Sequence, residues 1–130
     1  MAIEAPGVHS WTFVAGESLT AKQFHFVKLH TDGLVYACAA DTDNPVGILQ
    51  NKPASGEMAE VMLFGISKLA SNAALTAGVY VGTHTDGRGA PYAHGTDTTK
   101  YIAGRVLIPS STAGGIASVI FNCMALYRST

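Results

Sequence analysis

The sequence has 130 residues, which is enough for one domain with a hydrophobic core and too short for two domains of ordinary size. Charged residues make up 13% of the chain and apolar residues 48%, whereas an average soluble domain has roughly 25% charged residues. The formal net charge is −1 and no run of Lys or Arg occurs, so neither nucleic acid nor a membrane surface is an expected partner. With so little charge, we expect partner chains to cover part of the surface; the alternative is a small, neutral, compact protein.

The first ten residues show no strand pattern and contain Pro6-Gly7, so residues 1–10 are expected to form a flexible arm. Trp11 follows directly, and Trp is enriched at protein interfaces, although a core position is an equal alternative. The start of the chain lacks the basic stretch and apolar run of a secretory signal, and no segment reaches transmembrane length. We therefore expect a protein that is made and used without translocation.

Short segments rich in Val, Ile, Phe, Tyr and Thr alternate with Gly, Asp and Pro, which predicts an all-β chain. Helical periodicity is nowhere sustained. The predicted strands are 10–14, 24–29, 34–39, 46–50, 59–64, 79–81, 90–93, 102–108 and 116–127. The last of them is apolar on both faces, as in a central strand or in a strand that another subunit covers.

The tetrapeptide His-Thr-Asp-Gly occurs twice, at 30–33 and at 84–87. Leu-Thr-Ala precedes both copies at nearly the same distance, at 19–21 and at 75–77. This recurrence indicates that more than a turn is repeated.

The similarity continues downstream of both tetrapeptides. The segment VGILQNKPASGEMAEVMLF from Val46 matches AGRVLIPSSTAGGIASVIF from Ala103: each has a Gly near the start of an apolar strand, then a Pro, a Gly-containing turn and a second apolar strand. We infer that residues 17–65 and 73–122 are two copies of one β unit within a single domain. Two such units hide their faces and edges by packing together, which predicts a small β-barrel or β-sandwich.

The repeated tetrapeptide has two interpretations. Asp32-Gly33 and Asp86-Gly87 lie between apolar segments, a strong hairpin signal, because Gly adopts positive φ freely and Asp bonds nearby backbone. The functional alternative uses the two histidines and two aspartates together as a metal cluster, but nothing in the sequence indicates that the hairpin tips meet. We therefore interpret Asp32, Gly33, Asp86 and Gly87 as structural turn residues.

Other candidate sites fail on their spacing. The segment DTDNPVG at 41–47 opens like a calcium loop, but Val46 and Lys52 stand where that loop requires Gly and a bidentate Glu. Cys38 and Cys123 lie far apart in apolar segments and are expected to be buried free thiols. We find no paired carboxylates, nucleophile motif or phosphate-binding motif, so neither an enzyme nor a metal or other cofactor is expected.

The order LTAGVYVGTHTDG, YIAGRVL and a final ASVIF resembles the small phage proteins that act as capsid cement or head decoration proteins. The segment VGILQNKPASGEMAEVMLFG resembles the last two elements of the same pattern. At Gly114-Gly115 the chain departs from the family, which often has Gly-Glu there. The resemblance implies a non-enzymatic virion protein, made in the host cytoplasm, that binds the outside of the assembled capsid lattice and stabilises it, often as a trimer or dimer.

On this hypothesis the arm is the first place to look for shell contacts, with Pro6, Val8 and Trp11 as candidates. Two alternatives remain. One is another phage structural subunit, such as a tail tube or a fibre base, and the other is a small glycan-binding β module. A glycan-binding module is expected to expose a row of aromatic side chains, and the chain has only one Trp.

Overall fold

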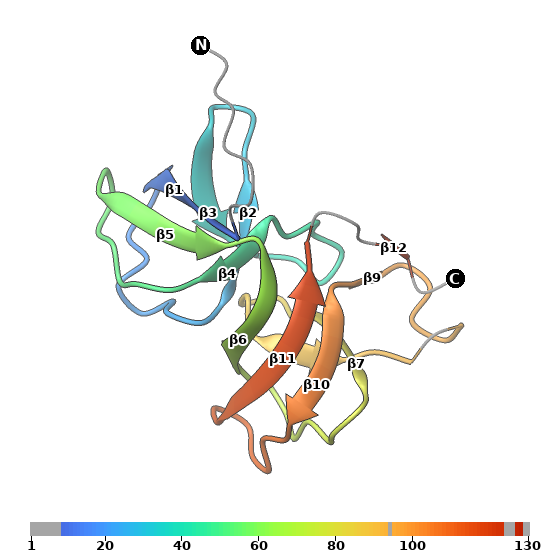
Figure 1. Ribbon diagram of the computed structural model, residues 1–130. Helices are drawn as coiled ribbons and strands as arrows, with labels where there is room; N and C mark the ends of the chain where they lie inside the picture. The colour runs from blue at the N-terminus through green and yellow to red at the C-terminus, as the bar shows by residue number, and fades with distance from the viewer. Residues whose placement is uncertain (1–8, 94, 124–126, 129–130) are drawn as a thin grey trace.

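The computed structural model describes residues 9–93, 95–123 and 127–128, and every regular element in them is a β-strand, which confirms the predicted all-β class. No helix in these residues is long and apolar enough to cross a bilayer. The strands, shown in Figure 1, are β1 Ser10–Ala15, β2 Phe26–Leu29, β3 Leu34–Ala37, β4 Gly47–Leu49, β5 Met58–Met62, β6 Phe64–Ala70, β7 Tyr80–Thr83, β8 Gly89–Pro91, β9 Tyr101–Ile102, β10 Gly104–Ile108, β11 Ile116–Asn122 and β12 Tyr127–Arg128.

The first five strands pair in the order β1-β3-β2-β4-β5, and β1 also pairs with β5, so this first unit closes on itself. Period-two alternation explains which side chains turn inward. In β5, for example, Ala59 and Val61 are buried while Glu60 between them is exposed. Val27, Val35 and Leu49 join them in a core that belongs to the first unit alone.

The second unit is an open sheet with the order β6-β11-β10-β7-β8. Its outer strands approach each other only through a single parallel bridge between Ser71 and Gly89. The whole chain is therefore sandwich-like rather than one closed barrel, with the first unit at upper left and the second at lower right in Figure 1. Strands β9 and β12 pair with each other beside the second unit.

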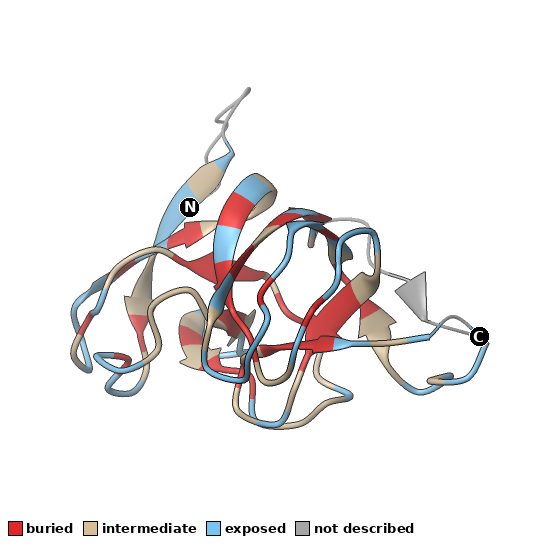
Figure 2. Cartoon of the chain, turned by 90° about the horizontal axis from the view of Figure 1, so that it is seen from below, coloured by how far each residue is buried: buried red, intermediate tan, exposed pale blue. Residues whose placement is uncertain are grey.

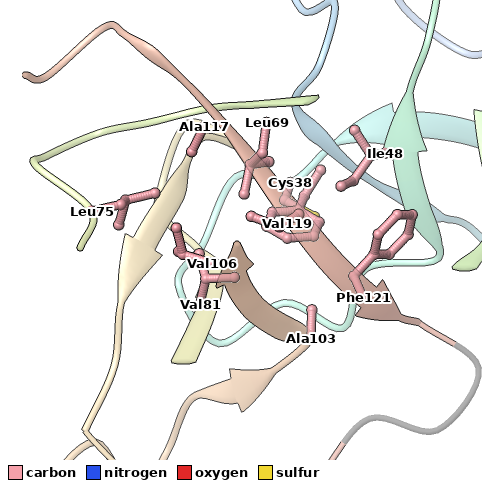
Figure 3. Packing of buried hydrophobic residues seen from close by; sticks show 11 residues of the cluster. Cys38, Ile48, Leu69, Leu75, Val81, Ala103, Val106, Ala117, Val119 and Phe121 are labelled. Carbon is pink, nitrogen blue, oxygen red and sulfur yellow. The ribbon is translucent and has the colours of Figure 1, made fainter. Parts of the chain in front are cut away.

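One buried cluster joins the two units. It combines first-unit side chains with the interior of the second sheet, as Figure 3 shows for Cys38 and Ile48 beside Val119 and Phe121. Phe26, whose side chain is fully buried, belongs to the same cluster. In Figure 2 the buried segments lie along the strands, and the exposed ones gather in the peripheral turns.

Strand pairing supports the proposed duplication. The order β1-β5-β4-β2-β3 in the first unit corresponds to β6-β11-β10-β7-β8 in the second, and every pair of neighbours in these two orders is antiparallel. Individual hydrogen bonds recur too: the Gly16 N–H donates to the Val35 carbonyl (2.9 Å), and the Asn72 N–H donates to the Gly89 carbonyl (2.8 Å). Because β1 begins before residue 17 and β6 begins at residue 64, the corresponding units extend beyond the boundaries inferred from sequence.

Several predicted strand limits were wrong. No strand was predicted over 65–72, where most of β6 lies. The predicted strand 24–29 begins only at Phe26, because Phe24 has a φ of 64° and leaves the extended conformation. The predicted strand 116–127 ends at Asn122. The predicted arm also ends earlier, since Ser10 already pairs with Met62.

Candidate interaction surface

The first His-Thr-Asp-Gly segment closes the hairpin between β2 and β3. The His30 N–H donates to the Leu34 carbonyl (3.0 Å), and the Leu34 N–H donates to Asp32 Oδ1 (2.9 Å). Gly33 has a φ of 82°, in the left-handed region that Gly enters without steric cost. The Tyr36 hydroxyl donates to Asp32 Oδ2 (2.8 Å), so both carboxylate oxygens of Asp32 are used within the exposed hairpin.

The second copy closes the hairpin between β7 and β8 in the same way, but it has a different environment. The Arg88 N–H donates to Asp86 Oδ1 (3.1 Å) and the Arg88 guanidinium to Asp86 Oδ2 (2.7 Å). The tip packs against the first unit, where the Gly87 carbonyl accepts the Phe26 N–H (2.7 Å) and the Asp86 carbonyl accepts Lys22 Nζ (3.2 Å). One tip is thus exposed and the other is docked, and each aspartate serves its own turn.

These turn carboxylates predict how stability depends on pH. The Leu34 N–H and the Tyr36 hydroxyl lower the pKa of Asp32. Partial burial opposes ionisation of Asp86, but the bonds from the Arg88 N–H and guanidinium outweigh it and lower its pKa. A carboxyl with a lower pKa in the folded state stabilises the fold above its unfolded pKa of about 3.9, and that contribution is lost as pH falls through the folded pKa.

We therefore expect the free energy of unfolding, measured by urea denaturation, to fall as the pH drops below about 4. Asp86→Asn should lower stability at neutral pH and flatten the acid limb, because the variant has no carboxylate to protonate at this position. An acid limb as steep in Asp86→Asn as in the wild type would show that this carboxylate does not contribute.

The calcium-like segment is held by cations of the protein itself. Asp43 Oδ2 accepts Lys28 Nζ (3.1 Å) and the N–H groups of Ala39 (2.8 Å) and Ala40 (3.0 Å). Asp41 pairs with Lys100 Nζ (3.2 Å). Among the described residues no group of three or more His, Cys, Asp or Glu side chains could hold a metal ion.

The two cysteines are free thiols, as the sequence analysis expected. Cys38 is buried, and burial raises the pKa of its thiol to about 12. Cys123 is only partly buried by exposed area, which differs from the expectation of full burial. Burial also raises the pKa of Cys123, so neither thiol is poised for nucleophilic chemistry.

Of the three candidate contact residues, Trp11 lies in β1, and Pro6 and Val8 lie outside the described residues. Trp11 pairs with Val61 at the end of the first unit, and 37% of its surface is exposed. Next to it, the His9 ring lies 4.7 Å from the Phe64 ring, between centroids, and the His9 carbonyl accepts the Leu63 N–H (2.8 Å). This end of the first unit presents a large aromatic side chain to solvent.

The outer face of the second sheet carries an apolar groove of about 460 Å³. Tyr80, Arg105 and Ile120 lie side by side on it, because Arg105 is the register partner of both others. The Arg105 guanidinium lies 5.2 Å from the centre of the Tyr80 ring and donates to the Gly78 carbonyl (3.2 Å). Ile120 is 47% exposed, and Ile66, opposite it on β6, is 61% exposed.

Sequence reasoning did not find this groove. The signal was the two-sided apolar pattern of 116–127, which indicated either a central strand or a covered one. β11 is central, between β6 and β10, and yet Ile116 and Ile120 on its outer face are half-exposed. The face therefore has the composition of a covered surface and lies open in the isolated chain.

Comparison with known proteins gives one informative likeness. No protein-family model and no curated protein matches the chain. Among solved structures, the fold is similar to the N base of the head fiber gp8.5 of bacteriophage phi29, with a TM-score of 0.64 and 16% identity. The match covers 92% of this chain and 98% of that chain. It shows a shared fold over nearly the whole of both.

Proposed function

We propose that the chain is a structural protein of a phage virion that attaches to the outside of the assembled head and stabilises it. The observation that carries this proposal is the end-to-end likeness of its fold to the base of a phage head fibre. The sequence resemblance to capsid cement and decoration proteins supports the same role from independent features. We propose no catalytic activity and no cofactor.

The surface of the chain suits attachment to a lattice. The closed first unit and the shared core give a firm body, while Trp11 and the open groove offer apolar area for contact with other chains. Many copies binding one shell need only modest affinity each if neighbouring copies also contact one another. We therefore take the major capsid protein lattice as the partner and expect the chain to form a homo-oligomer, a trimer or a dimer.

A second candidate function is the base of a head fibre, and the same structural likeness favours it. A fibre base also binds the head, but it carries a projecting element and need not strengthen the shell. The sequence analysis also left open a tail tube subunit and a glycan-binding module. No structural observation favours either of these.

Co-sedimentation tests the proposal directly. Purified protein is mixed with undecorated, expanded capsids of the phage that encodes it, the capsids are pelleted, and the bound protein is measured against its free concentration. We expect saturable binding at a fixed number of copies per shell. Absence from the pellet at all concentrations, together with tube formation by the protein alone, would replace the proposal with the tail tube alternative.

Thermal disruption of the same capsids separates cement from fibre base. A cement protein is expected to raise the temperature at which shells release their contents, because a ligand of the intact shell shifts the equilibrium towards it. A fibre base binds with little change in that temperature. Saturable binding without stabilisation would therefore favour the second candidate.

Removal of residues 1–8 tests the role of the arm. This cut keeps His9, which contacts Phe64, so the variant should retain the wild-type melting temperature. If the arm becomes ordered on the shell, co-sedimentation should weaken at least tenfold, about 1.4 kcal/mol. Trp11→Ala in the full chain separates the contribution of the aromatic side chain from that of the arm. Undiminished binding by both variants would remove this end of the molecule from the contact surface.

A further inference from the structure

The duplication places two equivalent rows of side chains on the molecule. In the first unit, Phe26, Ile48 and Met62 lie side by side across β2, β4 and β5. In the second unit, Tyr80, Arg105 and Ile120 lie side by side across the corresponding strands β7, β10 and β11. Both rows point away from the interior of their own unit.

The first-unit row is buried, because the second unit packs on it. Phe26 and Ile48 are fully buried in the cluster that joins the units, and Met62 packs against that cluster. Two backbone bonds hold the second unit in place: the Phe26 N–H donates to the Gly87 carbonyl (2.7 Å), and the Ala70 N–H donates to the Phe24 carbonyl (2.9 Å). Covering this row is therefore part of how one unit binds the next.

The second-unit row has no unit packed on it within the chain. Ile120 and Arg105 are exposed, Tyr80 is partly exposed, and together they line the groove. No carboxylate of the described residues pairs with the Arg105 guanidinium, which lies over the Tyr80 ring. By internal correspondence, this is the position at which a third unit would sit.

Strand register indicates which part of another unit fits there. β6 packs on the first unit through Leu69, a member of the joining cluster that pairs with Ala117 of β11. The corresponding residue in the first unit is Phe13, which pairs with Ala59 of β5. Two residues earlier on β1 stands the exposed Trp11, so the first unit presents an aromatic group at the equivalent edge.

We propose that a second copy of this chain covers the Tyr80–Arg105–Ile120 row with the β1 edge of its first unit, so that Trp11 lies over Arg105. The contact repeats between chains the packing of the second unit on the first within the chain. Arg over an indole face adds a cation–π attraction to the apolar burial. Because the two surfaces differ, copies join head to tail and either close into a ring or grow into a filament.

Site-directed cross-linking tests the pairing of the two surfaces. Ile120→Cys and Trp11→Cys are made in separate full-length chains, each checked for the wild-type melting temperature, and treated with a short bismaleimide. We expect a covalent dimer when the two variants are mixed and none from either alone. The wild type, with its buried Cys38 and partly buried Cys123, reports the background. Cross-linking of Ile120→Cys with itself would overturn the head-to-tail arrangement, as would no cross-linking in the mixture.

A charge reversal gives an independent measure. Arg105→Glu should weaken self-association at least tenfold in sedimentation equilibrium, and Lys52→Glu, an exposed residue on the first unit, makes the same charge change outside the groove. Equal association of both variants would overturn the inference. This inference rests on the self-association included in the proposed function, yet the two fail separately. A chain that stays monomeric but co-sediments with capsids overturns only the inference, and one that assembles but ignores capsids overturns only the capsid role.

Discussion

Gly104→Ala is expected to destabilise the protein by about 3 kcal/mol or more, at the upper end of the usual cost of overpacking. A Cβ at this position would collide with the Ile120 carbonyl oxygen and lie 2.8 Å from Phe121 Cα. These are backbone atoms of the neighbouring strand, so relief requires β10 and β11 to separate. Gly47, the corresponding residue of the first unit, meets the Met62 carbonyl oxygen in the same way and should be equally intolerant.

Gly33→Ala provides the matched control. Its φ of 82° makes a side chain there strained, but a Cβ would meet nothing within 4 Å. Only the left-handed backbone strain remains, about 1 kcal/mol. Urea denaturation of the two variants at neutral pH should therefore give clearly different midpoints. Equal losses would show that the close approach at Gly104 relaxes without cost.

Phe26→Ala should cost about 3–5 kcal/mol, the range for truncation of a buried aromatic side chain. Phe26 is fully buried and belongs to the cluster that unites the two units, so the loss falls on their junction as well as on β2. Because that cluster is shared, the wild type should unfold in one transition when followed by fluorescence and by far-ultraviolet circular dichroism.

Leu29→Ala on the same strand is the control for the Phe26 variant. Leu29 is 48% exposed, and substitutions at such sites usually change stability by less than about 0.5 kcal/mol. Two separate transitions in Phe26→Ala would show that the units retain independent stability once their junction is weakened. An effect as small as that of Leu29→Ala would contradict the role of Phe26 in the joining cluster.

The strands with regular alternation could be predicted from the sequence, and β6 could not. β6 turns Ser67 inward, where an apolar residue would be expected, so the period-two pattern is broken at its middle. The buried hydroxyl is satisfied by Gln50 Nε2 (3.0 Å) and by the Lys68 carbonyl (3.0 Å), partners that only the folded chain supplies. A polar residue with distant partners conceals its strand from any local reading.

The conserved spacing of Gly47 and Gly104 was visible in the two copies, but its reason was not. Each glycine admits the backbone of a neighbouring strand, and that closeness depends on tertiary packing. The groove was hidden for a related cause. Residues 116–122 read as apolar on both faces, and the sequence does not state that the face with Ile120 is the open one.

The docking of the second turn on the first unit makes two identical tetrapeptides unequal in what they can tolerate. A Cβ on Gly87 would lie 2.9 Å from the Phe26 carbonyl oxygen, so that tip has no room for additional atoms. The tip at 30–33 projects into solvent, at the far end of a short hairpin. The chain therefore offers one permissive point for a grafted peptide between Asp32 and Gly33, whereas the same graft between Asp86 and Gly87 would force the two units apart.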